Sequence, residues 1–121
     1  MSLQAYQQAA LRADSPRGAE YRLFGQVTLA LMEAQRGGAA DPSARADALE
    51  RNLRLWSVLA NDCADPQNRL PEALRAAIIS LSLWVDRHTR EIGQGAAEIA
   101  PLVEVNRMVM QGLGEGAPAQ G

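Results

Sequence analysis

The fold of this chain is decided by two stretches, NLRLW at residues 52–56 and NRLPE at residues 68–72. The first belongs to a run of apolar residues at spacings of four, three, four and three, which predicts a helix from about Pro42 to Cys63. Its members are Leu49, Leu53, Trp56, Ala60 and Cys63. The second stretch opens another helix at Pro71, after a turn rich in Asp, Pro and Asn. The sequence therefore predicts two facing Trp-bearing helices, an arrangement typical of a protein that holds another protein.

The helix that begins near Pro71 carries apolar residues on two sides. One side is a seam with alternating spacings of four and three, which is expected to face the bundle core. It contains Leu74, Ile78, Leu81, Val85, His88 and Ile92. Ile79 and Leu83 project about 160–180° away from this seam, at about 100° per residue. Such a helix is either buried all round or half-covered and available to a partner, and the sequence leaves both interpretations open.

Three further helices are expected from start and stop signals. A short amphipathic helix over about residues 3–13 is closed by Asp14, and a second runs from Pro16 to about Arg36, before two glycines. The apolar side of the second contains Leu23, Val27, Ala30, Leu31 and Ala34. The last helix spans about residues 96–112, and Pro101 either kinks it or marks its start. Its apolar side contains Ile99, Leu102, Val103, Val109, Met110 and Leu113.

These elements predict an all-α fold, a compact bundle of four to five helices. A chain of 121 residues suits one domain, expected over residues 1–113, with the Gly-, Ala- and Pro-rich residues 114–121 as a flexible tail. Hydrophobic residues make up 47% of the chain and aromatic residues only 4%, which favours closely packed aliphatic helices over a sheet.

Charge and cysteine usage narrow the class of protein. All twelve basic residues are Arg, which we attribute to genome composition, and they are interleaved with acidic residues at a net charge of −2. No basic stripe is visible, so direct binding of nucleic acid is disfavoured. Cys63 is the only cysteine, and the N-terminus lacks the pattern of a signal peptide. Without an uninterrupted apolar run of about 18 residues, a cytoplasmic protein with no membrane contact is expected.

The residues that could carry chemistry have simpler structural interpretations. Cys63 and His88 lie on apolar stripes and lack an evident orienting acid, and one Cys and one His fall short of a zinc site. Asp62, Asp65 and Asn68 do not have the spacing of a calcium loop and suit a helix end and a turn. The sequence therefore predicts no enzyme, no cofactor and no metal.

Binding to a partner is the stronger hypothesis. Trp56 and Trp84 are either core anchors with the indole N–H at the rim or parts of a partner groove. Asn106 lies within an apolar stripe, where its amide satisfies a neighbouring backbone group or fixes the register of a partner helix. The predicted partner-binding residues are Ile79, Leu83, Trp84 and Met108.

The chain resembles the FlaF family, the small flagellar biosynthesis regulators of α-proteobacteria, over nearly its whole length. The resemblance rests on an ordered combination of motifs rather than on one motif. It includes Ala5-Tyr6, Glu20-Tyr21, Asn52, Leu55, Trp56, Leu59, Asp62, Asn68, Leu70, Pro71, Leu74, Arg75, Ala76, Ile79, Ser80, Leu81, Trp84, Val85, Leu102, Asn106, Met110, Gly112 and Leu113. Cys63, Gly37-Gly38 and Pro101 are individual to this sequence.

The resemblance implies a cytoplasmic chaperone that binds flagellin and acts as a positive regulator of flagellin synthesis and export in filament assembly. Flagellin is then the expected partner, and FlbT, a repressor of flagellin synthesis, a further one. The alternative is a post-transcriptional regulator of flagellin mRNA translation that acts on RNA or through FlbT. The resemblance brings no catalytic residues, and self-association through the exposed apolar stripe stays open.

Overall fold

The computed structural model describes residues 16–119, which form four α-helices and no strand. They are α2 (Pro16–Gly37), α3 (Pro42–Ala64), α4 (Glu72–Gly93) and α5 (Ala100–Ala119), with a 3-10 turn, η1 (Gly38–Ala40), between the first two. This confirms the predicted all-α bundle of four to five helices. The helix expected over residues 3–13 lies outside the described residues.

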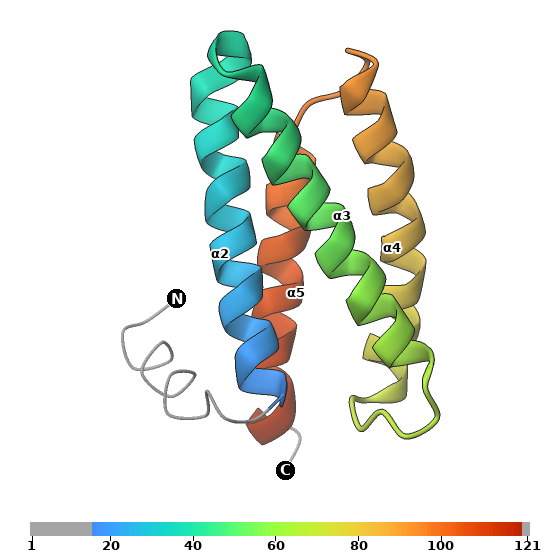
Figure 1. The fold of residues 1–121 in the computed structure, drawn as a ribbon. Coiled ribbons are helices and arrows are strands. Elements are labelled where there is room, and N and C mark those ends of the chain that lie inside the picture. The colour runs from blue at the N-terminus through green and yellow to red at the C-terminus, as the bar shows by residue number, and fades with distance from the viewer. Residues whose placement is uncertain (1–15, 120–121) are drawn as a thin grey trace.

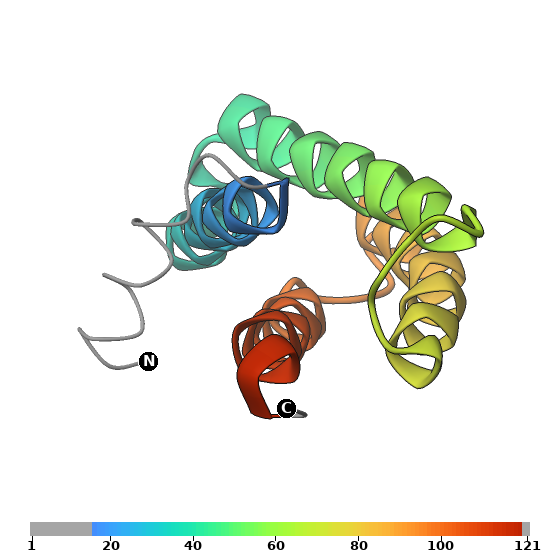
Figure 2. The same cartoon turned by 90° about the horizontal axis from the view of Figure 1, so that it is seen from below.

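The helices run alternately up and down, and α3 crosses the bundle obliquely (Figure 1). Helix α3 packs against α2 on one side and α4 on the other, and α2 also packs along α5. Seen from below, α2, α3 and α4 follow one another in an arc, and α5 lies across its open side, beside α2 (Figure 2). The pair α4 and α5 touches at only a few points.

The expected start and stop signals act where the sequence places them. The side chain of Asp41 accepts a hydrogen bond from the backbone N–H of Ala44 at 3.1 Å, so it caps α3, with Pro42 as the first helical residue. Gly38 has a φ of +58° in the link from α2, a conformation that favours glycine. Pro101 is the second residue of α5 and therefore marks the start of that helix rather than a kink.

Helix α5 continues to Ala119, past Gly112, where the sequence predicts its end. Neither of the glycines at 112 and 114 terminates the helix, although glycine is the commonest residue at a helix end. The bound at Gly112 was therefore wrong. The flexible tail over residues 114–121 stays a prediction.

The link between α3 and α4 is held by side-chain hydrogen bonds to the backbone. Carboxylate and amide oxygens of Asp65 and Asn68 each accept from a backbone N–H two residues on, at 2.9 Å. The guanidinium of Arg75 donates to the carbonyl oxygens of Cys63 (2.9 Å) and Asp65 (3.0 Å), and so satisfies the end of α3. These contacts agree with the turn interpretation of Asp65 and Asn68.

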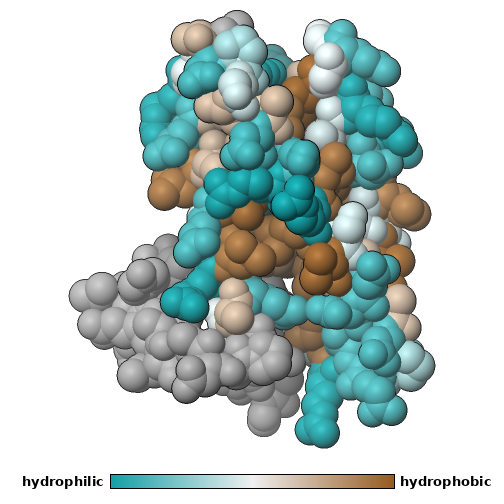
Figure 3. All heavy atoms as spheres, in the orientation of Figure 1, coloured by the Kyte–Doolittle hydropathy of each residue, from teal (hydrophilic) through white to brown (hydrophobic). Residues whose placement is uncertain are grey.

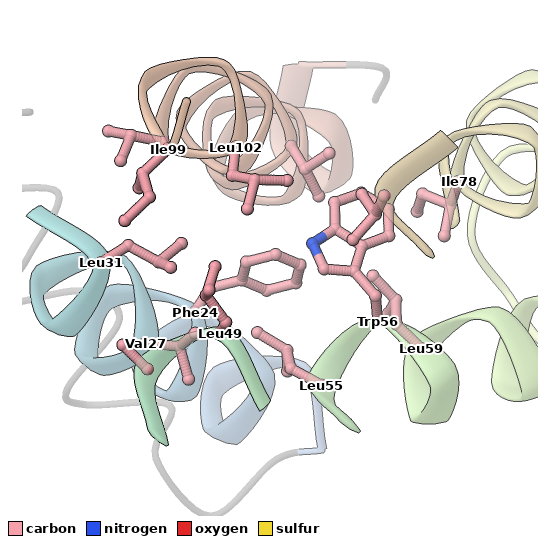
Figure 4. Close-up of a cluster of buried hydrophobic side chains, with 14 of the residues drawn as sticks. Phe24, Val27, Leu31, Leu49, Leu55, Trp56, Leu59, Ile78, Ile99 and Leu102 are labelled. Atoms are coloured by element: carbon pink, nitrogen blue, oxygen red, sulfur yellow. The ribbon is translucent and has the colours of Figure 1, made fainter. Parts of the chain in front are cut away.

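The core lies where α2, α3 and α5 meet and extends to α4 (Figure 4). The rings of Phe24 and Trp56 meet edge to face, with centroids 5.8 Å apart. The seam predicted on α4 is correct in direction, because Ile78, Val85 and Ile92 are its buried members.

The predicted apolar sides of α2 and α3 are correct at most positions, since Val27, Leu31 and Ala34 on α2 and Leu49, Trp56 and Cys63 on α3 are buried, but single positions differ. Leu23 is 44% exposed, while its neighbour Phe24, absent from the prediction, is fully buried. On α3, Leu53 is only partly buried, whereas Asn52 and Leu55 are buried. The physical reason is that each of these helices packs against two others, so its buried side turns towards a direction between the two neighbours.

Candidate functional site

A chain of buried hydrogen bonds joins three helices at the centre of the molecule. The indole Nε1 of Trp56 on α3 donates to Asn106 Oδ1 on α5 at 2.8 Å. Asn106 Nδ2 donates to Asn52 Oδ1 on α3 (2.8 Å) and to Thr28 Oγ1 on α2 (3.1 Å). Both asparagines are fully buried. We call these four residues the polar cluster.

The polar cluster corrects two expectations. Asn106 satisfies side chains of α2 and α3 rather than a neighbouring backbone group. Trp56 is a core anchor, but its N–H lies inside the bundle and not at the rim. Because these hydrogen bonds form only in one register, the cluster fixes how α2, α3 and α5 align. One donor, Asn52 Nδ2, has no partner among the described residues.

A second feature lies between α4 and α5, and contacts of individual side chains show how the two helices are oriented. Arg75 on α4 reaches the end of α3, so this side of α4 faces α3. Leu74 points towards α5, because a methyl group added at Gly112 would lie 3.7 Å from Leu74 Cδ1, and His88 points towards the segment that enters α5, where its Nε2 lies 2.7 Å from the carbonyl oxygen of Glu98. The α5-facing side of α4 therefore follows the line from Leu74 to His88.

Along that line, α4 presents residues at spacings of three, four, three and four, the spacing of a helix-contacting stripe. They are Leu74, Ala77, Leu81, Trp84 and His88. Counted around the helix axis at about 100° per residue, each of these residues lies within about 60° of the direction midway between Leu74 and His88. Ala77 is exposed and the other four are only partly buried.

Helix α5 presents a matching stripe. Arg107 and Met110 contact α2, through the sulfur atom of Met32 (3.8 Å) and the hydroxyl of Thr28 (3.9 Å). Gly112 points the opposite way, towards α4, and three other residues share its side within about 40°. The stripe consists of Pro101, Val105, Met108 and Gly112, none of them buried. We call the two stripes together the α4–α5 face.

The four predicted partner-binding residues do not share one surface. Trp84 and Met108 belong to the two stripes of the α4–α5 face, and Met108 is 65% exposed. Ile79 lies about 40° from Arg75, on the side of α4 that faces α3, and packs against the core. Leu83 is 69% exposed on the outer side of α4. Whether any of the four binds a partner stays a prediction.

His88 occupies one end of the α4–α5 face. Its ring stacks on Trp84, with centroids 4.8 Å apart and planes inclined by 21°. The carbonyl oxygen of Glu98 can only accept, so Nε2 carries the hydrogen and donates to it. Nδ1 lies 3.9 Å from Glu91 Oε1. His88 thus ties the end of α4 to the segment that enters α5.

Cys63 and His88 do not form a nucleophile–base pair. Arg75 holds the backbone of Cys63, and His88 lies 13 positions after Arg75 on α4, which is roughly 20 Å along the helix axis. Within residues 16–119, no three Cys, His, Asp or Glu side chains gather as a metal site would require.

We expect the thiol of Cys63 to react with a disulfide reagent at pH 8 at least about tenfold more slowly in the folded protein than in denaturant. Burial raises the pKa of this thiol, with Glu20 and Asp62 acting in the same direction and Arg75 against it. The stability linked to the neutral thiol is complete below the pKa of the unfolded chain and is lost as pH rises through the folded pKa. Timed labelling of both states measures the ratio, and equal rates would show an accessible thiol.

Comparison with known proteins shows which protein family this chain matches. A protein-family model described as "Flagellar protein FlaF" matches residues 2–113. No curated protein and no solved structure shows significant similarity to the chain. Among the described residues, no helix has the length and apolar character needed to span a bilayer.

Proposed function

The chain belongs to the FlaF family of flagellar proteins, and we propose that it is a cytoplasmic chaperone that binds unassembled flagellin through the α4–α5 face. Binding of this kind supports flagellin synthesis and export in filament assembly. The proposal includes no enzymatic activity and no cofactor.

The observation that carries the proposal is the pair of facing stripes, whose members are partly buried or exposed. The helix pairs α2–α3, α3–α4 and α2–α5 bury their contacting sides, whereas α4 and α5 leave theirs only partly covered. An amphipathic helix laid between them would contact both stripes at once, which is the helix-in-groove mode of peptide recognition. The α4–α5 face is therefore suited to a helical segment from another protein.

The chemistry of the face indicates an apolar client surface. Between its ends the face carries no charged side chain, and Ala77 offers a small surface that lets a helix backbone approach closely. Trp84 and Met108 offer the large aromatic and adaptable thioether surfaces common at binding sites. Flagellin's terminal segments, amphipathic and unfolded before assembly, have the character of such a client.

Calorimetry tests this proposal. Monomeric flagellin is titrated with the protein, first intact and then with either terminal segment deleted. We expect a stoichiometric complex that is lost when one particular terminus is removed, because a single face accommodates one helical segment. Binding that survives both deletions, or no binding between two folded proteins, would contradict it.

The alternative is regulation of flagellin mRNA translation, directly or through FlbT. The net charge of −2 disfavours direct RNA contact, which depends on phosphate neutralisation. FlbT would be a protein partner, and it would compete with flagellin for an apolar face of this protein. Titration of FlbT and a salt-dependent gel shift with flagellin leader RNA distinguish these routes when flagellin itself fails to bind.

A further inference from the structure

A second apolar surface lies away from the α4–α5 face, where α2 and α3 meet. Leu23 on α2 is 44% exposed and Val58 on α3 is 55% exposed, although both are large aliphatic residues. Figure 3 shows hydrophobic atoms gathered in the middle of the face on which α3 crosses in front of α5, surrounded by hydrophilic ones.

Helical geometry places Leu23, on α2, and Val58, on α3, at the edge of the contact between these two helices. Val27 on α2 and Leu55 on α3 are both buried and belong to the cluster drawn in Figure 4. Leu23 lies one turn before Val27 on the same side of α2. Val58 lies about 60° beyond Leu55, on the side away from Trp56. We call Leu23 and Val58, with Val27 and Leu55 beneath them, the α2–α3 patch.

The two exposed residues lie at the same level of the bundle. The ring contact of Phe24 with Trp56 pairs these positions across the antiparallel helices, and Leu23 and Val58 are one and two residues away from them. Towards this end of the bundle α3 moves away from α2 (Figure 1). The start of α2 at Pro16 lies at the same end.

We propose that the α2–α3 patch is the docking site of the chain's own residues 3–13, folded as an amphipathic helix. Four apolar residues of this segment recur at spacings of three, four and three, as on one side of a helix, whereas Leu11 lies on another side. The four are Leu3, Tyr6, Ala10 and Ala13. A docked segment of this kind completes the bundle as a fifth helix.

The length of the segment and the place where it joins α2 fit this site. Asp14 and Ser15 before Pro16 are turn-forming residues, so the segment can return antiparallel to α2. Tyr6 then lies about 12 Å back from the turn and Leu23 about 10 Å forward, at about 1.5 Å per residue. Tyr6 is thus brought to the level of Leu23 and Val58.

The charges near the α2–α3 patch and the range of residues that the family match covers also support residues 3–13 as the docked segment. Glu20 and Asp62 both act on Cys63, so they place negative charge at the end of the patch nearest the turn, where the segment carries Arg12. The family match begins at residue 2 and therefore includes the whole segment. Residues 3–13 belong to the family's domain and are not an appendage to it.

Amide hydrogen exchange on the full chain tests the docking. We expect amides of residues 5–13 to exchange at least about tenfold more slowly than in an unstructured chain, because a docked helix protects its hydrogen bonds. Val58→Asp places a charge within the patch and should return these amides to the rates of an unstructured chain. Leu83→Asp, which places the same charge on the exposed outer side of α4, is the matched control and should leave them protected.

Nuclear Overhauser effects identify the occupied surface. We expect contacts from the Tyr6 ring to the methyl groups of Leu23 and Val58, unchanged on dilution. Contacts to Val105 and Met108 instead would place the segment on the α4–α5 face, and concentration-dependent contacts would indicate a second copy. Either result, or unprotected amides in the parent chain, overturns the proposal.

Discussion

Replacing Asn106 with Ala is expected to lower the free energy of unfolding by about 3–5 kcal/mol, a large effect for one side chain. The amide of Asn106 is the hub of the polar cluster, with Trp56, Asn52 and Thr28 as its partners. Its removal leaves the Trp56 N–H and the Asn52 oxygen buried without a partner, and each such group costs about 1–3 kcal/mol. Denaturant unfolding followed by far-UV circular dichroism measures the loss.

Two comparisons separate the cluster from general destabilisation. Asn52→Leu should cost less than Asn106→Ala, because it removes one hydrogen bond together with the unpartnered Asn52 Nδ2. Trp56→Phe should cost less in the Asn106→Ala background than in the parent, since the indole N–H has already lost its acceptor. Arg54→Ala, on the exposed surface, should change stability by no more than about 0.5 kcal/mol. Additive effects of Asn106 and Trp56 would contradict the hub role.

Ala77→Arg is expected to weaken flagellin binding at least about a hundredfold, or about 2.7 kcal/mol, while the helical content stays unchanged. Ala77 is exposed, so the longer side chain has room in the free protein. In the proposed complex the Arg side chain and its charge would occupy the position of the client helix, within an apolar interface. Calorimetric titration of the variant against monomeric flagellin measures the change.

The neighbouring Ala76 provides a matched control. It is also exposed, but it lies about 100° away from Ala77 and about 20° from the direction of Leu83, on the outer side of α4. Ala76→Arg should bind flagellin as the parent does. If Ala76→Arg weakens binding and Ala77→Arg does not, the client binds the outer side around Leu83 and the α4–α5 face is not the site.

The helices and their first residues could be predicted because the signals that start a helix act over only a few residues of sequence. Asp41 before Pro42 caps α3 as a short-range hydrogen bond, and the Pro71 signal precedes α4 by one residue. The buried members of the α4 seam, such as Ile78 and Val85, also follow from periodicity, because α4 has one dominant packing partner.

The polar cluster and the α4–α5 face could not be predicted from periodicity alone. Asn52 looks like a surface residue until α5 brings Asn106 against it, a contact between positions 54 residues apart. The sequence did single out Asn106, as a polar residue within an apolar stripe, but not its partners. Trp84 and Met108 were recognised as candidates, whereas their facing stripes emerge only when the contacts of Leu74, His88 and Gly112 orient the helices.

The polar cluster also divides the bundle mechanically. It joins α2, α3 and α5, while the described side chains of α4 donate only to the end of α3, to their own helix and to Glu98. A rotation of α4 about its edge along α3 therefore breaks none of the cluster's buried hydrogen bonds. The three joined helices are thus held together by directional buried hydrogen bonds, whereas α4 is held by the apolar packing of Ile78, Val85 and Ile92 and by the contacts of Arg75 and His88 near its two ends.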